Sequence, residues 1–131
     1  MRIIWSVIVV LGLLSIPFLC TSQTTLHGSY RKRAASDIRM LMAALDDFAT
    51  SHENRFPASL HELFGKDANN NPYLVPFQMR EPQDGWGRPY DYEPPTEGHP
   101  RPRVLSRGSD GQRGGVDDAA DIDSDALPKD G

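Results

Sequence analysis

Hydrophobic and polar residues divide the chain into an apolar beginning and a mostly polar remainder. Residues 3–20 form a run of eighteen residues without a charged side chain. As an α-helix rising 1.5 Å per residue, this run covers about 27 Å, close to the hydrocarbon thickness of a bilayer. The pattern predicts either a retained transmembrane anchor or a cleaved signal peptide within residues 1–22, and either would export the rest of the chain.

The next periodic segment predicts an amphipathic helix over residues 34–49. Its apolar residues recur at intervals of three and four, as one face of a helix requires. They are Ile38, Leu41, Leu45 and Phe48, and charged residues lie between them. We expect this face to pack on a sheet. Residues 23–33, which include the basic cluster 31–33, are predicted to be a polar linker.

Shorter elements are expected after the helix. Ser59 and Glu62 have the spacing of a capping box, which predicts a short helix that ends at Gly65. Short strands are predicted at residues 73–75, 88–93 and 103–106, where apolar or aromatic residues lie between proline-containing segments. The predicted fold class is therefore α+β, with one helix packed on a small three-stranded antiparallel sheet.

Length and charge set the limits of this domain. The chain has 131 residues, which allows one small globular domain, placed here at residues 34–122. The net charge is −4, and residues 104–131 hold seven aspartates against three basic residues, so the acidic excess lies at this end. An acidic end without a basic stripe argues against nucleic-acid binding. Residues 123–131 lack periodicity and are expected to form an acidic, disordered tail.

The motifs of common enzymes are missing. His61-Glu62 has no second histidine at zinc-protease spacing, and the chain contains neither a Gly-x-Ser-x-Gly elbow nor a P-loop lysine. Cys20 is the only cysteine and lies in the apolar run, which excludes an intrachain disulfide. We therefore expect a protein that is not an enzyme and has no small-molecule substrate.

A glycine-rich segment with aspartates is the strongest sign of chemistry in the chain. Residues 106–115 read SRGSDGQRGG, and Asp121 follows six residues later. Glycines permit positive φ and tight turns, while carboxylates and inward-facing carbonyls are the hard oxygen ligands that Ca²⁺ binds. The segment predicts a loop that a cation closes.

Three motifs in fixed order carry a family resemblance. They are Asp-x-Trp-Gly-x-Pro-Tyr-x-Tyr at 84–92, Ser-x-Gly-x-Asp-Gly-x-x-Gly-Gly at 106–115, and Ala-Asp-Ile at 120–122. Together they resemble the C-terminal half of the major (G-type) pseudopilin of type II secretion systems, over roughly residues 34–122. The resemblance implies a pilin-like fold with a retained N-terminal membrane helix, a periplasmic domain and a C-terminal calcium loop.

The same resemblance implies a set of calcium ligands. Asp110 and Asp121 correspond to carboxylate ligands, and Arg107 and Ser109 would contribute backbone oxygens. Asp84 would be a nearby ligand or an acceptor just outside the ligand set. Asp117 and Asp118 fall where the loop length varies, so their participation is left open.

The beginning of the chain departs from the family pattern. It has no Gly-Phe junction after a short basic leader and no glutamate near the start of the apolar run. We therefore expect no processing by a prepilin peptidase. Cleavage as a signal peptide would leave the protein periplasmic or secreted.

The expected function is that of a structural component of a type II secretion or related pilus-like machine. Its partners would be other pseudopilin-like subunits, the secretion machinery and the inner membrane, the last through residues 3–20. The alternative is an exported or anchored calcium-binding interaction module that does not assemble into a filament.

Overall fold

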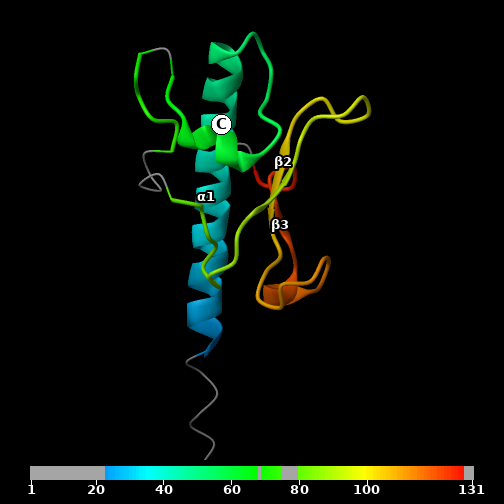
Figure 1. Ribbon diagram of the computed structural model, residues 1–131. Helices are drawn as coiled ribbons and strands as arrows, with labels where there is room; N and C mark the ends of the chain where they lie inside the picture. Colours follow the sequence, from blue (N-terminus) through cyan, green and yellow to red (C-terminus); the bar gives the residue numbers. More distant parts are fainter. Residues whose placement is uncertain (1–22, 68, 75–79, 129–131) are drawn as a thin grey trace, which may run out of the picture.

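The computed structural model describes residues 23–67, 69–74 and 80–128. One long helix, α1 (Gln23–Ser51), lies along a three-stranded antiparallel sheet (Figure 1). The strands are β1 (Asp91–Glu93), β2 (Arg103–Ser106) and β3 (Ile122–Asp123), in the spatial order β1-β2-β3. This arrangement confirms the predicted α+β class.

The core forms between the apolar face of α1 and the inner face of the sheet. Ile38, Leu41 and Leu45 are fully buried, as the helical periodicity predicted. From the sheet side, Val104 and Ile122 complete the same cluster. Because β2 is the central strand and residues 104–106 are all buried, this strand fixes the position of the segments that follow it.

Two tyrosines attach the β1 region to the helical layer. The Tyr90 hydroxyl donates to Asp37 Oδ2 of α1 at 3.0 Å, and the Tyr92 hydroxyl donates to the Pro57 carbonyl at 2.7 Å. Burial raises the pKa of Tyr92 to about 12 and raises that of Tyr90 further, with the neighbouring Asp37 adding to the rise. Both phenols therefore stay protonated donors near neutral pH.

The helix begins earlier than predicted. Residues 23–33 were expected to be a linker, but they form the first turns of α1. Apolar periodicity alone could not show that residues 23–33 are helical, because Tyr30 is held there by a partner distant in sequence. Its ring meets Trp86 edge to face at 5.8 Å, and a Cβ on Gly85 would lie 2.6 Å from the Tyr30 Cβ. Trp86 packs at the edge of the core.

The membership of the sheet also differs from the prediction. The strand expected at 73–75 is wrong for its first two residues, because Tyr73 and Leu74 lie in a turn; Val75 is outside the described residues. Leu74 still enters the core, without strand pairing. The third strand is instead Ile122–Asp123, in register with Ser106 and Leu105. The strand expected at 88–93 is shorter and begins at Asp91.

The short helix after residue 59 is confirmed, although its cap differs. It is a 3₁₀ helix, η1 (Leu60–Phe64), that ends before Gly65. The Ser59 side chain makes no capping hydrogen bond. Glu62 does reach back, but its Oε1 accepts from the Ala58 backbone N–H at 2.9 Å, one residue before the position that a capping box would use.

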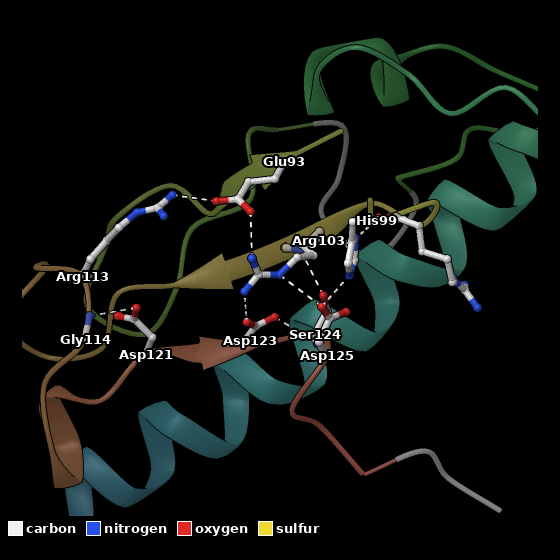
Figure 2. Close-up of polar contacts among 11 residues, drawn as sticks. Glu93, His99, Arg103, Arg113, Gly114, Asp121, Asp123, Ser124 and Asp125 are labelled. Carbon is white, nitrogen blue, oxygen red and sulfur yellow. Dashed lines mark hydrogen bonds and ion pairs between the residues drawn. The ribbon is translucent and has the colours of Figure 1, made fainter. Parts of the chain in front are cut away.

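Part of the expected acidic tail is built into the sheet. Asp123 belongs to β3 and forms a short ion pair with Arg103, while Asp125 Oδ2 lies 3.2 Å from Arg103 Nε and 2.9 Å from His99 Nε2 (Figure 2). Burial, the largest single influence, raises the pKa of Asp123, but the hydrogen bonds from the Arg103 guanidinium and the Asp125 N–H, together with nearby positive charge, lower it below its ordinary value. Asp123 is therefore a strand residue and not part of the predicted solvated tail, while Asp125 is exposed, as predicted, but ion-paired with Arg103.

The predicted anchor, residues 3–20, lies outside the described residues. Within the part that the structure describes, no helix combines the length and the apolar character needed to cross a membrane.

Candidate metal site in the glycine loop

The glycine loop, residues 107–121, connects β2 to β3 beside the N-terminal half of α1 (Figure 1). Its ends are neighbours because Ser106 pairs with Ile122 across the two strands. Gly108 and Gly115 have φ of 59° and 84°, and a Cβ on either would lie 2.6 Å or 2.5 Å, respectively, from the Ala119 carbonyl oxygen. Glycine is thus required at both positions by backbone conformation and by close contact.

Asp121 lies where the two arms of the loop meet. Its backbone N–H donates to the Gly114 carbonyl at 3.0 Å, and its Oδ2 accepts from the Gly114 N–H at 2.9 Å (Figure 2). The other carboxylate oxygen, Oδ1, is shielded from solvent and has no hydrogen-bond donor among the described residues. A shielded carboxylate oxygen without a donor is a position where a cation would be stabilising.

Asp110 lies at an exposed turn of the loop. Its Oδ1 accepts from the Gln112 N–H at 2.9 Å. The two predicted carbonyl ligands already accept hydrogen bonds: the Arg107 carbonyl from the Gly111 N–H at 3.2 Å, and the Ser109 carbonyl from the Arg88 guanidinium at 3.0 Å. The structure thus places Asp110 on the same short loop as these carbonyls, with Asp121 at the end of the loop.

The Arg107 side chain turns toward the sheet. Its Nε donates to Asp91 Oδ2 at 2.6 Å, and this hydrogen bond raises the pKa of Arg107, with the nearby negative charges of Asp91 and Asp121 acting in the same direction. The guanidinium therefore adds positive charge near Asp121, while the backbone oxygen of Arg107 takes part in the loop turn.

Asp84 is almost completely buried and contacts Ser106, the residue that precedes the glycine loop. Its Oδ1 accepts from the backbone N–H groups of Trp86 and Arg88, each at 3.0 Å, and its Oδ2 accepts from the Ser106 hydroxyl at 2.7 Å. This carboxylate joins the turn 84–88 to the last residue of β2. It thereby fixes the point from which the glycine loop departs.

Two arginines that sequence reasoning did not assign to the site hold the loop. Arg88 donates to the carbonyls of Gly108 and Ser109, at 2.7 and 3.0 Å. Arg31 of α1 donates to the Ala120 carbonyl at 2.6 Å and to the Asp118 carbonyl at 3.4 Å. These contacts could not be predicted from residue types, because backbone carbonyls carry no residue-specific pattern.

The oxygen atoms of the loop are of the chemical types that bind a hard cation such as Ca²⁺. They combine carboxylates with backbone carbonyls, and the shielded Asp121 Oδ1 is the atom whose surroundings most favour an ion. Within the described ranges, no three histidine, cysteine or acidic side chains gather as a metal-binding group. Backbone carbonyls and water would therefore have to supply most of the ligands.

Comparison with protein families matches residues 23–125 to the model of type II secretion system protein G. The match covers most of the chain and includes the long helix, the sheet and the glycine loop. The chain belongs to this pseudopilin family. A comparison with curated proteins gives no match.

Membership establishes the general role. The protein is a pseudopilin component of type II secretion, which is a structural and not an enzymatic role. It implies interaction with the secretion machinery and is consistent with a membrane-anchored, periplasmic location.

Proposed function

We propose that this pseudopilin is held in the inner membrane by residues 3–20, with its domain in the periplasm, and that Ca²⁺ binds its glycine loop. Asp121 and Asp110 would supply carboxylate oxygens, and Arg107 and Ser109 would supply carbonyl oxygens. Asp84 would act from outside the ligand set, because its carboxylate already accepts three hydrogen bonds from the protein. The bound ion would fix the surface that the loop presents to a neighbouring pseudopilin subunit.

The observation that carries the calcium proposal is the shielded Oδ1 of Asp121. Leaving a buried carboxylate oxygen without a donor costs free energy, and an ion would offset this cost. The loop also has little apolar area with which to close itself, since its large apolar residue, Val116, is 76% exposed. A polar closing interaction is therefore needed more here than in the core.

The calcium test is a thermal melt of the full chain in detergent, in chelator and in millimolar Ca²⁺. Binding to the folded state alone stabilises by RT ln(1 + [L]/Kd), about 2.7 kcal/mol at a hundredfold excess over Kd. We expect Ca²⁺ to raise the Tm of the wild type, and Asp121→Ala and Asp110→Ala to reduce the rise. Asp47→Ala is the matched control, because Asp47 is exposed and its carboxylate has no partner among the described residues.

The calcium proposal is rejected if Ca²⁺ does not raise the Tm of the wild type. It is also rejected if Asp47→Ala reduces the rise in Tm as much as Asp121→Ala does.

The anchor is tested separately by cell fractionation with N-terminal sequencing of the domain. Retention in the inner membrane fraction supports it, whereas a soluble species that begins near Gln23 contradicts it. Co-purification of the membrane-extracted chain with other pseudopilins distinguishes an assembled subunit from an interaction module that stays outside the assembly.

A further inference from the structure

Arg88 binds the glycine loop through backbone carbonyls alone. Its two terminal nitrogens donate to the carbonyls of Gly108 and Ser109, at 2.7 and 3.0 Å. Among the described residues, no carboxylate forms an ion pair with Arg88. The planar guanidinium fork matches the geometry of a carboxylate or phosphate. Here, a side-chain cation is bound by the neutral oxygens of a loop.

Both the backbone of Arg88 and the loop that it contacts restrict where the guanidinium lies. In the backbone, the Arg88 N–H donates to Asp84 Oδ1 at 3.0 Å, and the Arg88 carbonyl accepts from the Asp84 N–H at 2.8 Å. On the loop side, Gly111 has φ of 70°, and a Cβ there would lie 2.8 Å from Arg88 Nε. The absence of a side chain at Gly111 lets the guanidinium approach the backbone. Arg88 is thus seated in a closely fitting position.

We propose that Arg88 is an internal competitor of calcium: it closes the loop when calcium is scarce and lowers the affinity of the loop for the ion. This inference rests on the proposed calcium site. The Ser109 carbonyl that Arg88 occupies is also one of the proposed ligands. A carbonyl oxygen has two lone pairs, so the conflict comes mainly from charge. A guanidinium and a divalent ion on one oxygen repel each other strongly at such short separation. Ca²⁺ therefore binds at the expense of the contact between Arg88 and Ser109.

Arg31 provides a matched control. It is also an arginine that donates to carbonyls of the same loop, at Ala120 and Asp118. Those carbonyls are outside the proposed ligand set. Removing Arg31 takes away the same charge from the same loop but does not free a ligand oxygen, so its effect on calcium affinity should be smaller than that of removing Arg88.

The experiment is calorimetric titration of the chelator-treated full chain in detergent with CaCl₂. We expect Arg88→Ala to bind Ca²⁺ about tenfold more tightly than the wild type, equivalent to about 1.4 kcal/mol, because the ion no longer displaces a charged hydrogen bond. Arg31→Ala should change Kd less than about threefold, since no proposed ligand is released. Arg88→Lys, which keeps the charge but loses the two-pronged geometry, should lie between wild type and Arg88→Ala and provides a second variant if Arg88→Ala folds poorly.

Hydrogen exchange in chelator measures the closing role independently of calcium. The N–H groups of Ser109 and Gly111 donate to the Asp118 and Arg107 carbonyls within the loop, at 2.9 and 3.2 Å. Arg88→Ala should exchange faster at these two amides, while the amides of the α1 core residues keep their protection. Unchanged protection of the loop amides would show that Arg88 does not close the loop.

The titration separates the two proposals. Tighter binding in Arg88→Ala supports the competition. If the wild type binds Ca²⁺ and Arg88→Ala binds it equally or more weakly, the competition is wrong while the calcium site stands. If neither protein binds Ca²⁺, both proposals are rejected. An equal gain in affinity from Arg31→Ala would also reject the competition, because it would assign the effect to loop charge in general.

Discussion

Replacing Asp84 tests whether its carboxylate holds the turn 84–88 against Ser106, the residue before the glycine loop. Its carboxylate accepts three hydrogen bonds in a site where the residue is only 4% exposed. Asp84→Ala leaves two backbone N–H groups and the Ser106 hydroxyl without an acceptor. Hydrogen bonds to a charged group contribute about 1.5–3 kcal/mol each and are not additive, so we expect a loss of about 3–5 kcal/mol of unfolding free energy. That is a large part of the stability of a small domain.

The milder variant Asp84→Asn sharpens this test. An asparagine oxygen can still accept from the Trp86 and Arg88 N–H groups, and its NH₂ can donate to the Ser106 hydroxyl, which then accepts. Because the hydrogen-bond count is kept and only the charge is lost, we expect a cost of about 1 kcal/mol. Ser106→Ala leaves Asp84 Oδ2 buried without its donor and should cost about 1–3 kcal/mol. In the Asp84→Ala background, the same change should cost much less.

The assay is thermal unfolding of the full chain, monitored by circular dichroism. For a domain of 60–100 residues, 1 kcal/mol shifts Tm by about 4–8 °C, so the Ala and Asn variants should be clearly separated. A loss below about 1 kcal/mol in Asp84→Ala would refute the structural role of the carboxylate. Equal costs of Ser106→Ala in both backgrounds would show that Asp84 and Ser106 are not energetically coupled.

Three further changes test the core, its buried acid and the loop backbone. Leu41→Ala should cost about 2–5 kcal/mol in denaturant unfolding, because this fully buried side chain leaves a cavity in the core; a cost under 1 kcal/mol would contradict the packing. Burial raises the pKa of Asp37 above its ordinary value of 3.8, against the lowering effects of Tyr90 and Arg33, with Asp84 adding to the rise. Because the folded state binds the Asp37 proton more tightly than the unfolded state, the free energy of unfolding should fall as pH rises from 3.8 through the raised pKa. Asp37→Asn should remove this fall when unfolding is measured across pH. An unchanged pH slope in Asp37→Asn would reject this role of Asp37. Gly115→Ala should open the loop to hydrogen exchange more than Gly114→Ala, since both have positive φ but only a Cβ at Gly115 would meet a carbonyl oxygen, at 2.5 Å; equal effects would contradict the close contact.

The helix and the fold class could be predicted because their signals are local. Ile38, Leu41 and Leu45 recur with the helical period, and the structure buries all three. The helical state of residues 23–33 could not be predicted in this way. Tyr30, within these turns, packs against the turn at Gly85 and Trp86, a contact between segments more than fifty residues apart in sequence. Periodicity within one segment contains no information on such a contact.

The third strand escaped prediction because it is very short. Ile122–Asp123 has only two residues, too few for alternation to be visible, and its pairing depends on β2 being present beside it. Tyr73 and Leu74 have the composition of a strand, but Leu74 fills the core from a turn. Burial and strand pairing are separate properties, and composition reports mainly on burial.

The glycine loop was predictable in its position and less so in its contacts. Glycines and aspartates identified the loop, because positive φ and hard oxygens have residue-specific signatures. Arg31 and Arg88 were not recognised as parts of it, since their partners are backbone carbonyls. The contacts of Asp84 were equally unpredictable. Its carboxylate accepts from the turn 84–88 and from Ser106, and only the fold brings the end of β2 next to residue 84.

Calcium binding to the glycine loop is tested most directly by a calcium titration of the ¹⁵N-labelled full chain in detergent, monitored by amide NMR. The Gly114 N–H donates to Asp121 Oδ2 and therefore reports on this carboxylate. We expect saturable shifts of the Gly114 and Gly111 amides in Ca²⁺, absent in Asp121→Ala, with the amide of Asp47 unchanged. Resonances of the loop that do not respond to millimolar Ca²⁺ would contradict the proposal that calcium binds there.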